Sequence, residues 1–139
     1  MKTKIYRVIA ITLLFFLGFW AIFGGLALIT DPTGESLQIS LDYLEDSTFE
    51  DYLVPGFILL FANGILALVI AISVVRRVEN YAFFIMVQGM VLVLWLSIQL
   101  YMNPAFYAPY LHISCYVIGI LLLIFGALIK VPKERKMEQ

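Results

Sequence analysis

Four long apolar runs restrict the fold of this chain more than any other feature of its sequence. They cover about residues 5–30, 54–75, 81–101 and 110–129, and the core of each lacks Asp, Glu, Lys and Arg. A helix needs ~20 predominantly apolar residues to cross a hydrocarbon layer of ~30 Å. A backbone in lipid must also satisfy its own hydrogen bonds, so each run is predicted to be a transmembrane α-helix.

Composition agrees with a membrane protein of one domain. The chain is 63% hydrophobic and only 14% charged, whereas a soluble domain carries roughly 25% charged residues. The later connections are too short to separate domains. We therefore predict an all-α fold in which residues 1–139 form a single transmembrane domain, an antiparallel four-helix bundle embedded in the lipid bilayer.

The first run has an alternative interpretation as a signal peptide, because three basic residues lie at its start. The apolar region of a signal peptide is typically about 7–15 residues long, and a cleavage site with small residues follows it. Residues 5–30 form a much longer run that contains Trp20 and is followed by no clear site of this kind. We expect the first span to be retained.

The basic residues all lie on one side of the predicted bundle. Three are at the start of the first span, two lie between the second and third, and four follow the fourth. The other two connections contain no Lys or Arg, and residues 31–53 carry seven acids. The positive-inside rule then predicts that both termini are cytoplasmic and that residues 31–53 form a structured outer loop. The nine basic residues are Lys2, Lys4, Arg7, Arg76, Arg77, Lys130, Lys133, Arg135 and Lys136.

Residues 31–53 contain several local signals. Asp31-Pro32-Thr33-Gly34 is typical of a turn. Residues 36–41 alternate polar and apolar side chains, which fits a short strand or extended segment, while Leu41 and its neighbours fit a short interfacial helix equally well. The seven acids could hold a cation, but they lack calcium-loop spacing, so we favour a solvated loop.

The end of this loop resembles a helix start. Ser47-Thr48-Phe49-Glu50 fits a capping box, in which the first and fourth side chains satisfy backbone N–H groups. We therefore expect a helix to begin near Thr48 and to continue into the second span. Pro55 would kink this helix or mark its true start.

The polar side chains predicted to lie inside the membrane or at its edge are mostly neutral. Gln88, Trp95 and Gln99 share one helix face, since offsets of 7 and 11 residues return to nearly the same angle. Helix packing through hydrogen bonds explains these groups, and the alternative is a ligand pocket open to the outer leaflet. In that pocket His112 would lie at the membrane edge as a titratable group. The candidate ligand-binding residues are Asn63, Gln88, Trp95, Gln99, Tyr110 and His112.

Small residues recur on one face of several spans, which predicts close helix packing. Gly18, Ala21 and Gly25 share a face of the first span. In the second span the shared face holds Gly56, Asn63, Ala67 and Ala71, and in the fourth it holds Gly119 and Gly126.

Several classes of function lack the residues that they need. The single cysteine, Cys115, excludes an intrachain disulfide and a Cys-x-x-Cys motif. No catalytic, metal-binding or phosphate-binding motif is present, so no catalytic residue, metal or cofactor is expected. The chain also lacks a basic aromatic surface suited to nucleic acid. Spans without ionisable groups in their cores argue against an ion-coupled transporter.

Part of the first half resembles small, uncharacterised four-span membrane proteins that are common in bacteria. The likeness lies in Gly24-Gly25-Leu26-Ala27-Leu28, in the Asp31–Gly34 turn, in residues 47–56 and in Asn63-Gly64. The plan also resembles DoxX-like proteins more distantly, although no functional residue of that family matches a position here. The resemblance implies a helix bundle in a bacterial inner membrane and no particular activity.

Three hypotheses of function follow. The first is a binding or accessory protein for a lipid, another hydrophobic ligand or a partner membrane protein. The second is a passive transporter or channel subunit that acts as a homo-oligomer, because four helices rarely enclose a pore alone. The third and weakest is a membrane enzyme that uses His112 with an acid of the outer loop.

Overall fold

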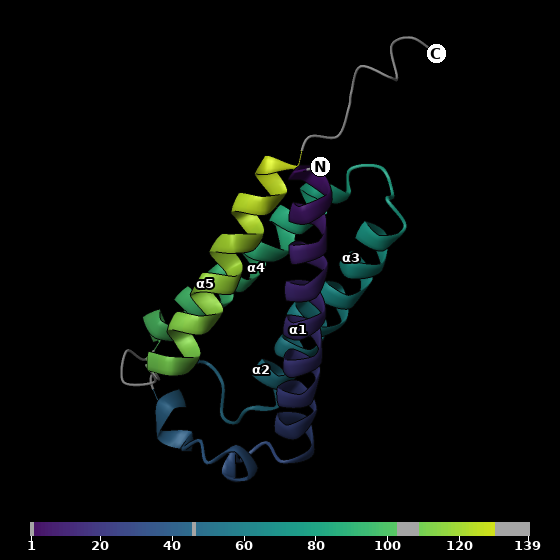
Figure 1. Cartoon of the computed structure of the whole chain (residues 1–139). Coiled ribbons are helices and arrows are strands. Elements are labelled where there is room, and N and C mark those ends of the chain that lie inside the picture. The colour runs from purple at the N-terminus through teal and green to yellow at the C-terminus, as the bar shows by residue number, and fades with distance from the viewer. Residues whose placement is uncertain (1, 46, 103–108, 130–139) are drawn as a thin grey trace.

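The described chain is helical apart from its connections. The computed structural model describes residues 2–45, 47–102 and 109–129. The elements in chain order are α1 (Lys2–Thr30), the 3-10 helices η1 (Glu35–Leu37) and η2 (Leu41–Leu44), α2 (Leu53–Ile58), the π-helix η3 (Leu59–Ile65), α3 (Leu66–Val75), α4 (Tyr81–Met102) and α5 (Pro109–Leu128) (Figure 1).

Four long helices in the described part of the chain are each long and apolar enough to cross a membrane. They are Lys2–Thr30, Leu53–Val75, Tyr81–Met102 and Tyr110–Leu128. The second consists of α2, η3 and α3 without a break, and we call it the α2–α3 helix. These bounds agree with the predicted spans to within a few residues.

The helices meet at two ends that differ in structure (Figure 1). One end, the turn end, holds the start of α1, residues 76–80 and the end of α5. The opposite end, the loop end, holds residues 31–52, which we call the connecting loop. The most extensive helix contacts are those of α1 with the α2–α3 helix and of α4 with α5. The bundle is therefore built from two helix pairs.

The main apolar core joins the two pairs. It contains Leu14 of α1, Val74 of α3, Ile85 of α4 and Leu122 of α5, none of which is exposed. The rings of Tyr6 and Phe125 add a contact near the turn end, with centroids 5.5 Å apart. A second and smaller cluster of Leu28, Leu44 and Tyr52 lies where the connecting loop meets the helices.

Glycines let α1 and the α2–α3 helix approach each other closely. A Cβ added to Gly25 would lie 2.8 Å from the backbone nitrogen of Leu60 and 2.9 Å from the carbonyl oxygen of Gly56. A Cβ on Gly64 would lie 2.7 Å from a side-chain carbon of Ile22. These distances are shorter than van der Waals contact, so the helices can lie this close only without those side chains. The predicted close packing is confirmed for Gly25 and Gly56, whereas Gly64, and not the predicted Asn63, lies on the face toward α1.

The start of the α2–α3 helix differs from the prediction. The helix begins at Leu53, so the expected start near Thr48 is wrong. Ser47 does not cap a helix; its hydroxyl donates to the Leu44 carbonyl oxygen (2.9 Å) and accepts from the Phe49 N–H (3.2 Å). Pro55 is the third helical residue, where a missing N–H costs nothing. Pro55 thus marks the helix start.

The connecting loop forms short helical turns. The predicted turn at its start is confirmed, since the Gly34 N–H donates to the Asp31 carbonyl oxygen (3.1 Å) and Gly34 has a φ of 80°. The suggested strand at residues 36–41 is not observed, because these described residues belong to η1, to a break and to the start of η2. The Ser40 hydroxyl accepts from the Asp42 N–H (3.1 Å) and caps η2. The short-helix alternative is therefore the one observed.

We predict that Gly25→Ala destabilises the bundle by roughly 1–3 kcal/mol, because the new methyl group would push α1 away from the backbone of the α2–α3 helix. Gly24→Ala is the matched control. Its methyl group would meet only the tip of Leu59, at 3.2 Å, which can move. Reversible unfolding in mixed micelles measures both changes, and equal stability of the two variants would contradict the close contact.

Candidate functional site

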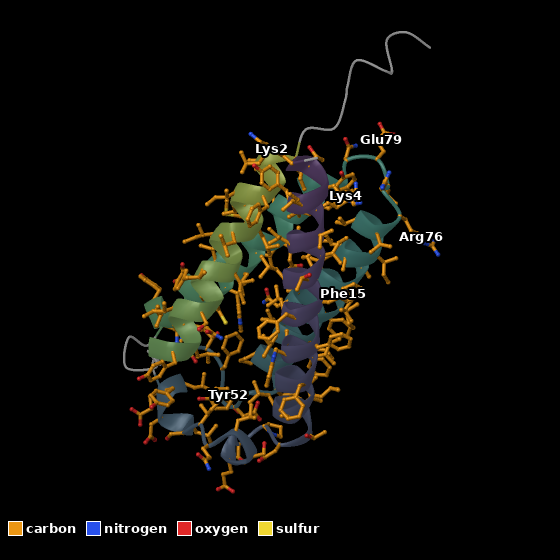
Figure 2. All side chains as sticks on the ribbon, in the orientation of Figure 1. Lys2, Lys4, Phe15, Tyr52, Arg76 and Glu79 are labelled. Atoms are coloured by element: carbon orange, nitrogen blue, oxygen red, sulfur yellow. The ribbon has the colours of Figure 1, made fainter. Side chains whose placement is uncertain are left out.

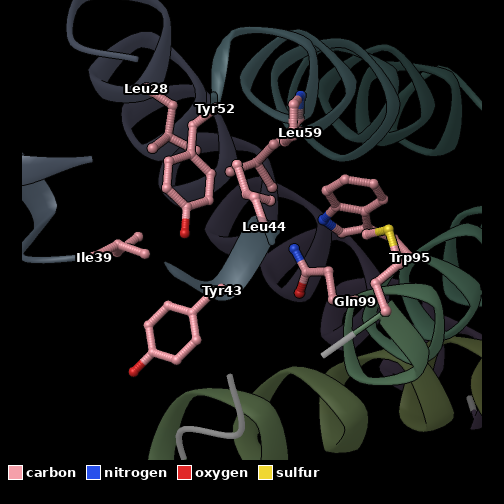
Figure 3. Close-up of a pocket in the computed structure, with 10 residues that line it drawn as sticks. Leu28, Ile39, Tyr43, Leu44, Tyr52, Leu59, Trp95 and Gln99 are labelled. Carbon is pink, nitrogen blue, oxygen red and sulfur yellow. The ribbon is translucent and has the colours of Figure 1, made fainter. Parts of the chain in front are cut away.

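A cavity of about 60 Å³ lies between the connecting loop and the helices at the loop end (Figure 3). We call it the loop-end cavity. Its walls come from α1, the loop, the start of the α2–α3 helix and the end of α4, and none of the described lining residues is charged. The lining residues are Leu28, Ile39, Tyr43, Leu44, Tyr52, Pro55, Leu59, Trp95, Gln99 and Met102.

Tyr52 holds the connecting loop over this cavity. Its hydroxyl donates to the Ser40 carbonyl oxygen (2.6 Å), and its backbone N–H donates to the Pro32 carbonyl oxygen (2.9 Å). The ring packs closely on Gly34, where an added Cβ would lie 2.9 Å from it. One residue therefore connects the beginning, the middle and the end of the loop.

Asp31 stabilises the first turn of the loop. Its carboxylate accepts hydrogen bonds from the Thr33 hydroxyl and from the Ser36 N–H, the latter at 2.9 Å. These bonds, the one from Thr33 above all, lower the pKa of Asp31 below its ordinary value. The carboxylate is thus ionised at neutral pH and accepts both hydrogen bonds in its charged form.

Two of the predicted ligand-binding residues lie together at the cavity. Trp95 is only 8% exposed, and Gln99 is half-buried one turn further along α4. Figure 3 shows the indole nitrogen of Trp95 and the carboxamide of Gln99 on the side of Leu44. No described residue hydrogen-bonds either side chain. They supply N–H donors and one carbonyl acceptor to a cavity that is otherwise mostly apolar.

Two further predicted residues form a separate polar pair. Asn63 in η3 and Gln88 in α4 are both fully buried. The Gln88 amide nitrogen donates to the Asn63 side-chain oxygen (3.3 Å) and to the Ala62 carbonyl oxygen (3.2 Å). Neither residue lines the loop-end cavity. At 1.5 Å per residue they lie roughly 6 Å beyond Leu59 and 10 Å beyond Trp95 along their helices.

The last two predicted residues do not join either group. Tyr110 is 92% exposed and does not line the loop-end cavity. His112 is fully buried in α5, and it does not line the loop-end cavity. The described residues of α5 do not line the loop-end cavity, so the prediction that Tyr110 and His112 bind a ligand has no support from this cavity.

Sequence reasoning missed the residues that the connecting loop contributes. Ile39, Tyr43 and Leu44 line the cavity beside Tyr52. Their apolar side chains in an acidic loop were a signal of burial, but their order along the chain does not say which helices they cover. Among the residues that the structure describes, no group of three or more His, Cys, Asp or Glu is placed to hold a metal ion.

No protein family, curated protein or solved structure matches this chain. Its function is therefore inferred from the geometry of the site.

We predict that Tyr52→Phe loosens the loop and changes its response to alkaline pH. Burial, with a smaller effect of Tyr43, raises the pKa of Tyr52 from 10.0 to about 12. The raised pKa means that Tyr52 stabilises the fold fully below pH 10, and that this stabilisation is lost as the pH rises toward 12. Because the variant lacks the hydrogen bond to Ser40, its free energy of unfolding at pH 7 should be lower by roughly 0.5–1.5 kcal/mol.

The free energy of unfolding, measured from pH 7 to 12, tests this prediction. The difference between the wild type and Tyr52→Phe should shrink above pH 10. Tyr101→Phe is the control, since Tyr101 is 90% exposed. A constant difference across this range would show that Tyr52 does not hold the loop through its neutral hydroxyl.

Proposed function

We propose that this chain is an integral protein of a bacterial inner membrane, with an antiparallel four-helix bundle and both termini in the cytoplasm. The four long apolar helices support the spans. Figure 2 labels Lys2, Lys4 and Arg76 at the turn end, whereas Tyr52 lies at the loop end. Basic residues prefer the cytoplasmic side of a membrane, so this separation supports a cytoplasmic turn end.

Selective labelling tests the orientation. Cys115→Ala removes the only native cysteine of the chain, and a new cysteine is then placed at Ser36 in the loop or at Val78 in the turn. A membrane-impermeant maleimide added to intact spheroplasts should label Ser36→Cys and should label Val78→Cys only after lysis. The reverse pattern would overturn the proposed orientation.

We propose further that the protein binds an apolar chain of a lipid in the loop-end cavity. The observation that carries this proposal is a mostly apolar cavity, closed on one side by the connecting loop, with Trp95 and Gln99 among its neutral polar residues. An apolar wall with a few placed polar groups is the usual composition of a small-ligand site. A lipid chain fills the apolar part, while a carbonyl or hydroxyl oxygen of the same lipid can accept from the donors.

Passive transport has less support from the same geometry. The loop-end cavity is lined by residues near one end of the bundle. Its deepest lining residues, Leu59 and Trp95, lie nearer the loop end than the buried Asn63 and Gln88 pair. A continuous polar path through the bundle would need this core to open. Lipid binding requires no such change.

Fluorescence quenching tests the lipid proposal. Trp20→Phe leaves Trp95 as the single tryptophan of the chain, and the protein is placed in vesicles whose phosphatidylcholine chains carry bromine, a quencher of tryptophan. Trp95 should be quenched strongly. Leu44→Phe from the loop, or Leu28→Phe from α1, fills the cavity and should remove most of this quenching.

Leu41→Phe is the matched control, because Leu41 lies on the same 3-10 helix as Leu44 but is 40% exposed and does not line the cavity. It should leave the quenching unchanged. Equal quenching in the filled variants and the control would show that the bromine reaches Trp95 from the surrounding bilayer, and the proposal would fail.

A further inference from the structure

The Asn63 and Gln88 pair has two polar atoms that the hydrogen bonds within the pair do not use. The Asn63 side-chain nitrogen and the Gln88 side-chain oxygen are buried and have no hydrogen-bond partner among the described residues. A buried amide without a partner is costly, because it has lost its bonds to water. Asn63 and Gln88 therefore point to a further binding partner.

The orientation of both amides follows from the backbone. The Gln88 amide nitrogen donates to the Ala62 carbonyl oxygen (3.2 Å), and a flipped Gln88 would place two acceptor oxygens against each other. With Gln88 in this orientation, its nitrogen faces the Asn63 oxygen (3.3 Å), so the Asn63 orientation is determined as well. Exchange of nitrogen and oxygen, a common ambiguity of amides, does not satisfy the two remaining atoms.

The π-helix η3 places Asn63 toward Gln88. In a π-helix the N–H bonds the carbonyl five residues earlier, as the Leu66 N–H does with the Phe61 carbonyl oxygen. Such segments are rare and are frequent at functional sites. Gly64, the next residue, packs on Ile22 of α1 instead. Of these two adjacent residues, Gly64 contacts α1 and Asn63 faces Gln88 in the second helix pair.

The described charged residues lie far from the Asn63 and Gln88 pair, and this restricts the charge of its ligand. The described basic residues lie in the first turns of α1 and in residues 76–80, and the described acids lie in the connecting loop and that same turn. No charge in the core of the spans would offset an ion. A single ligand that satisfies both atoms must be neutral, and it must accept one hydrogen bond and donate another.

We propose that Asn63 and Gln88 together bind one neutral hydroxyl group. Its oxygen accepts from the Asn63 side-chain nitrogen, and its proton is donated to the Gln88 side-chain oxygen. The hydroxyl belongs to a water molecule or to a long-chain alcohol. Buried waters commonly satisfy such groups. This site is distinct from the loop-end cavity, and the proposal does not depend on lipid binding there.

Solid-state NMR of protein labelled with ¹⁵N-asparagine in deuterated bilayers tests the proposal. The Asn63 side-chain signal is assigned by its loss in Asn63→Leu. Its N–H protons should show a through-space contact to water, or to the hydroxymethyl protons of added 1-hexadecanol. The first result identifies water as the source and the second identifies an alcohol. Asn80, which is exposed in the turn, is the positive control for water contact.

Gln88→Met removes the acceptor and should abolish the contact at Asn63, whereas Met90→Leu, at a 47% exposed position of the same helix, should retain it. Either a wild-type Asn63 amide that contacts protein groups alone, or a contact that persists in Gln88→Met, would overturn the proposal. The wild-type measurement decides the question even where Gln88→Met fails to fold.

Discussion

The direct contact between the backbones of α1 and the α2–α3 helix determines the position of most other parts of the molecule. Gly18 faces Gly64, and Gly25 faces Gly56. These pairs are separated by seven residues on α1 but by eight on its partner. Eight residues of a regular α-helix would leave the second glycine about 80° away from the first. The π-helix lies between Gly56 and Gly64 and absorbs the extra residue, so that both glycines face α1.

The same irregular segment creates the polar pair. A regular helix would place Asn63 on the face that contains Gly56, and its amide would then enter the close contact with α1. In the structure Gly64 occupies that contact, and Asn63 turns toward Gln88 of α4. The extra residue therefore permits close packing within one helix pair and a hydrogen bond between the two pairs. The glycine contact and the polar pair depend on each other through the geometry of η3.

The sequence predicted those features that depend on local patterns. Apolar length located the four long helices, small residues at helical spacing located the contacts of Gly18, Gly25 and Gly56 but not that of Gly64, and Asp31-Pro32-Thr33-Gly34 located a turn. It did not reveal η3, because the length of a π-segment depends on the match between two facing helices. The capping pattern at Ser47 failed because its hydroxyl finds partners within the loop, and Pro55 then marks the start of the helix. The loop-end cavity was missed because it depends on where Tyr52 anchors the loop.

The charges of the molecule restrict what can enter it. Six described acids lie in the connecting loop around the loop-end cavity: Asp31, Glu35, Asp42, Glu45, Glu50 and Asp51. The described basic residues lie at the turn end, about a bundle length away, which far exceeds the ~8 Å over which charges act at physiological salt. An anionic headgroup at the loop end would meet repulsion without a compensating base. A neutral or cationic headgroup avoids this cost, and the uncharged walls of the cavity and of the Asn63 and Gln88 pair are suited to the neutral parts of such a molecule.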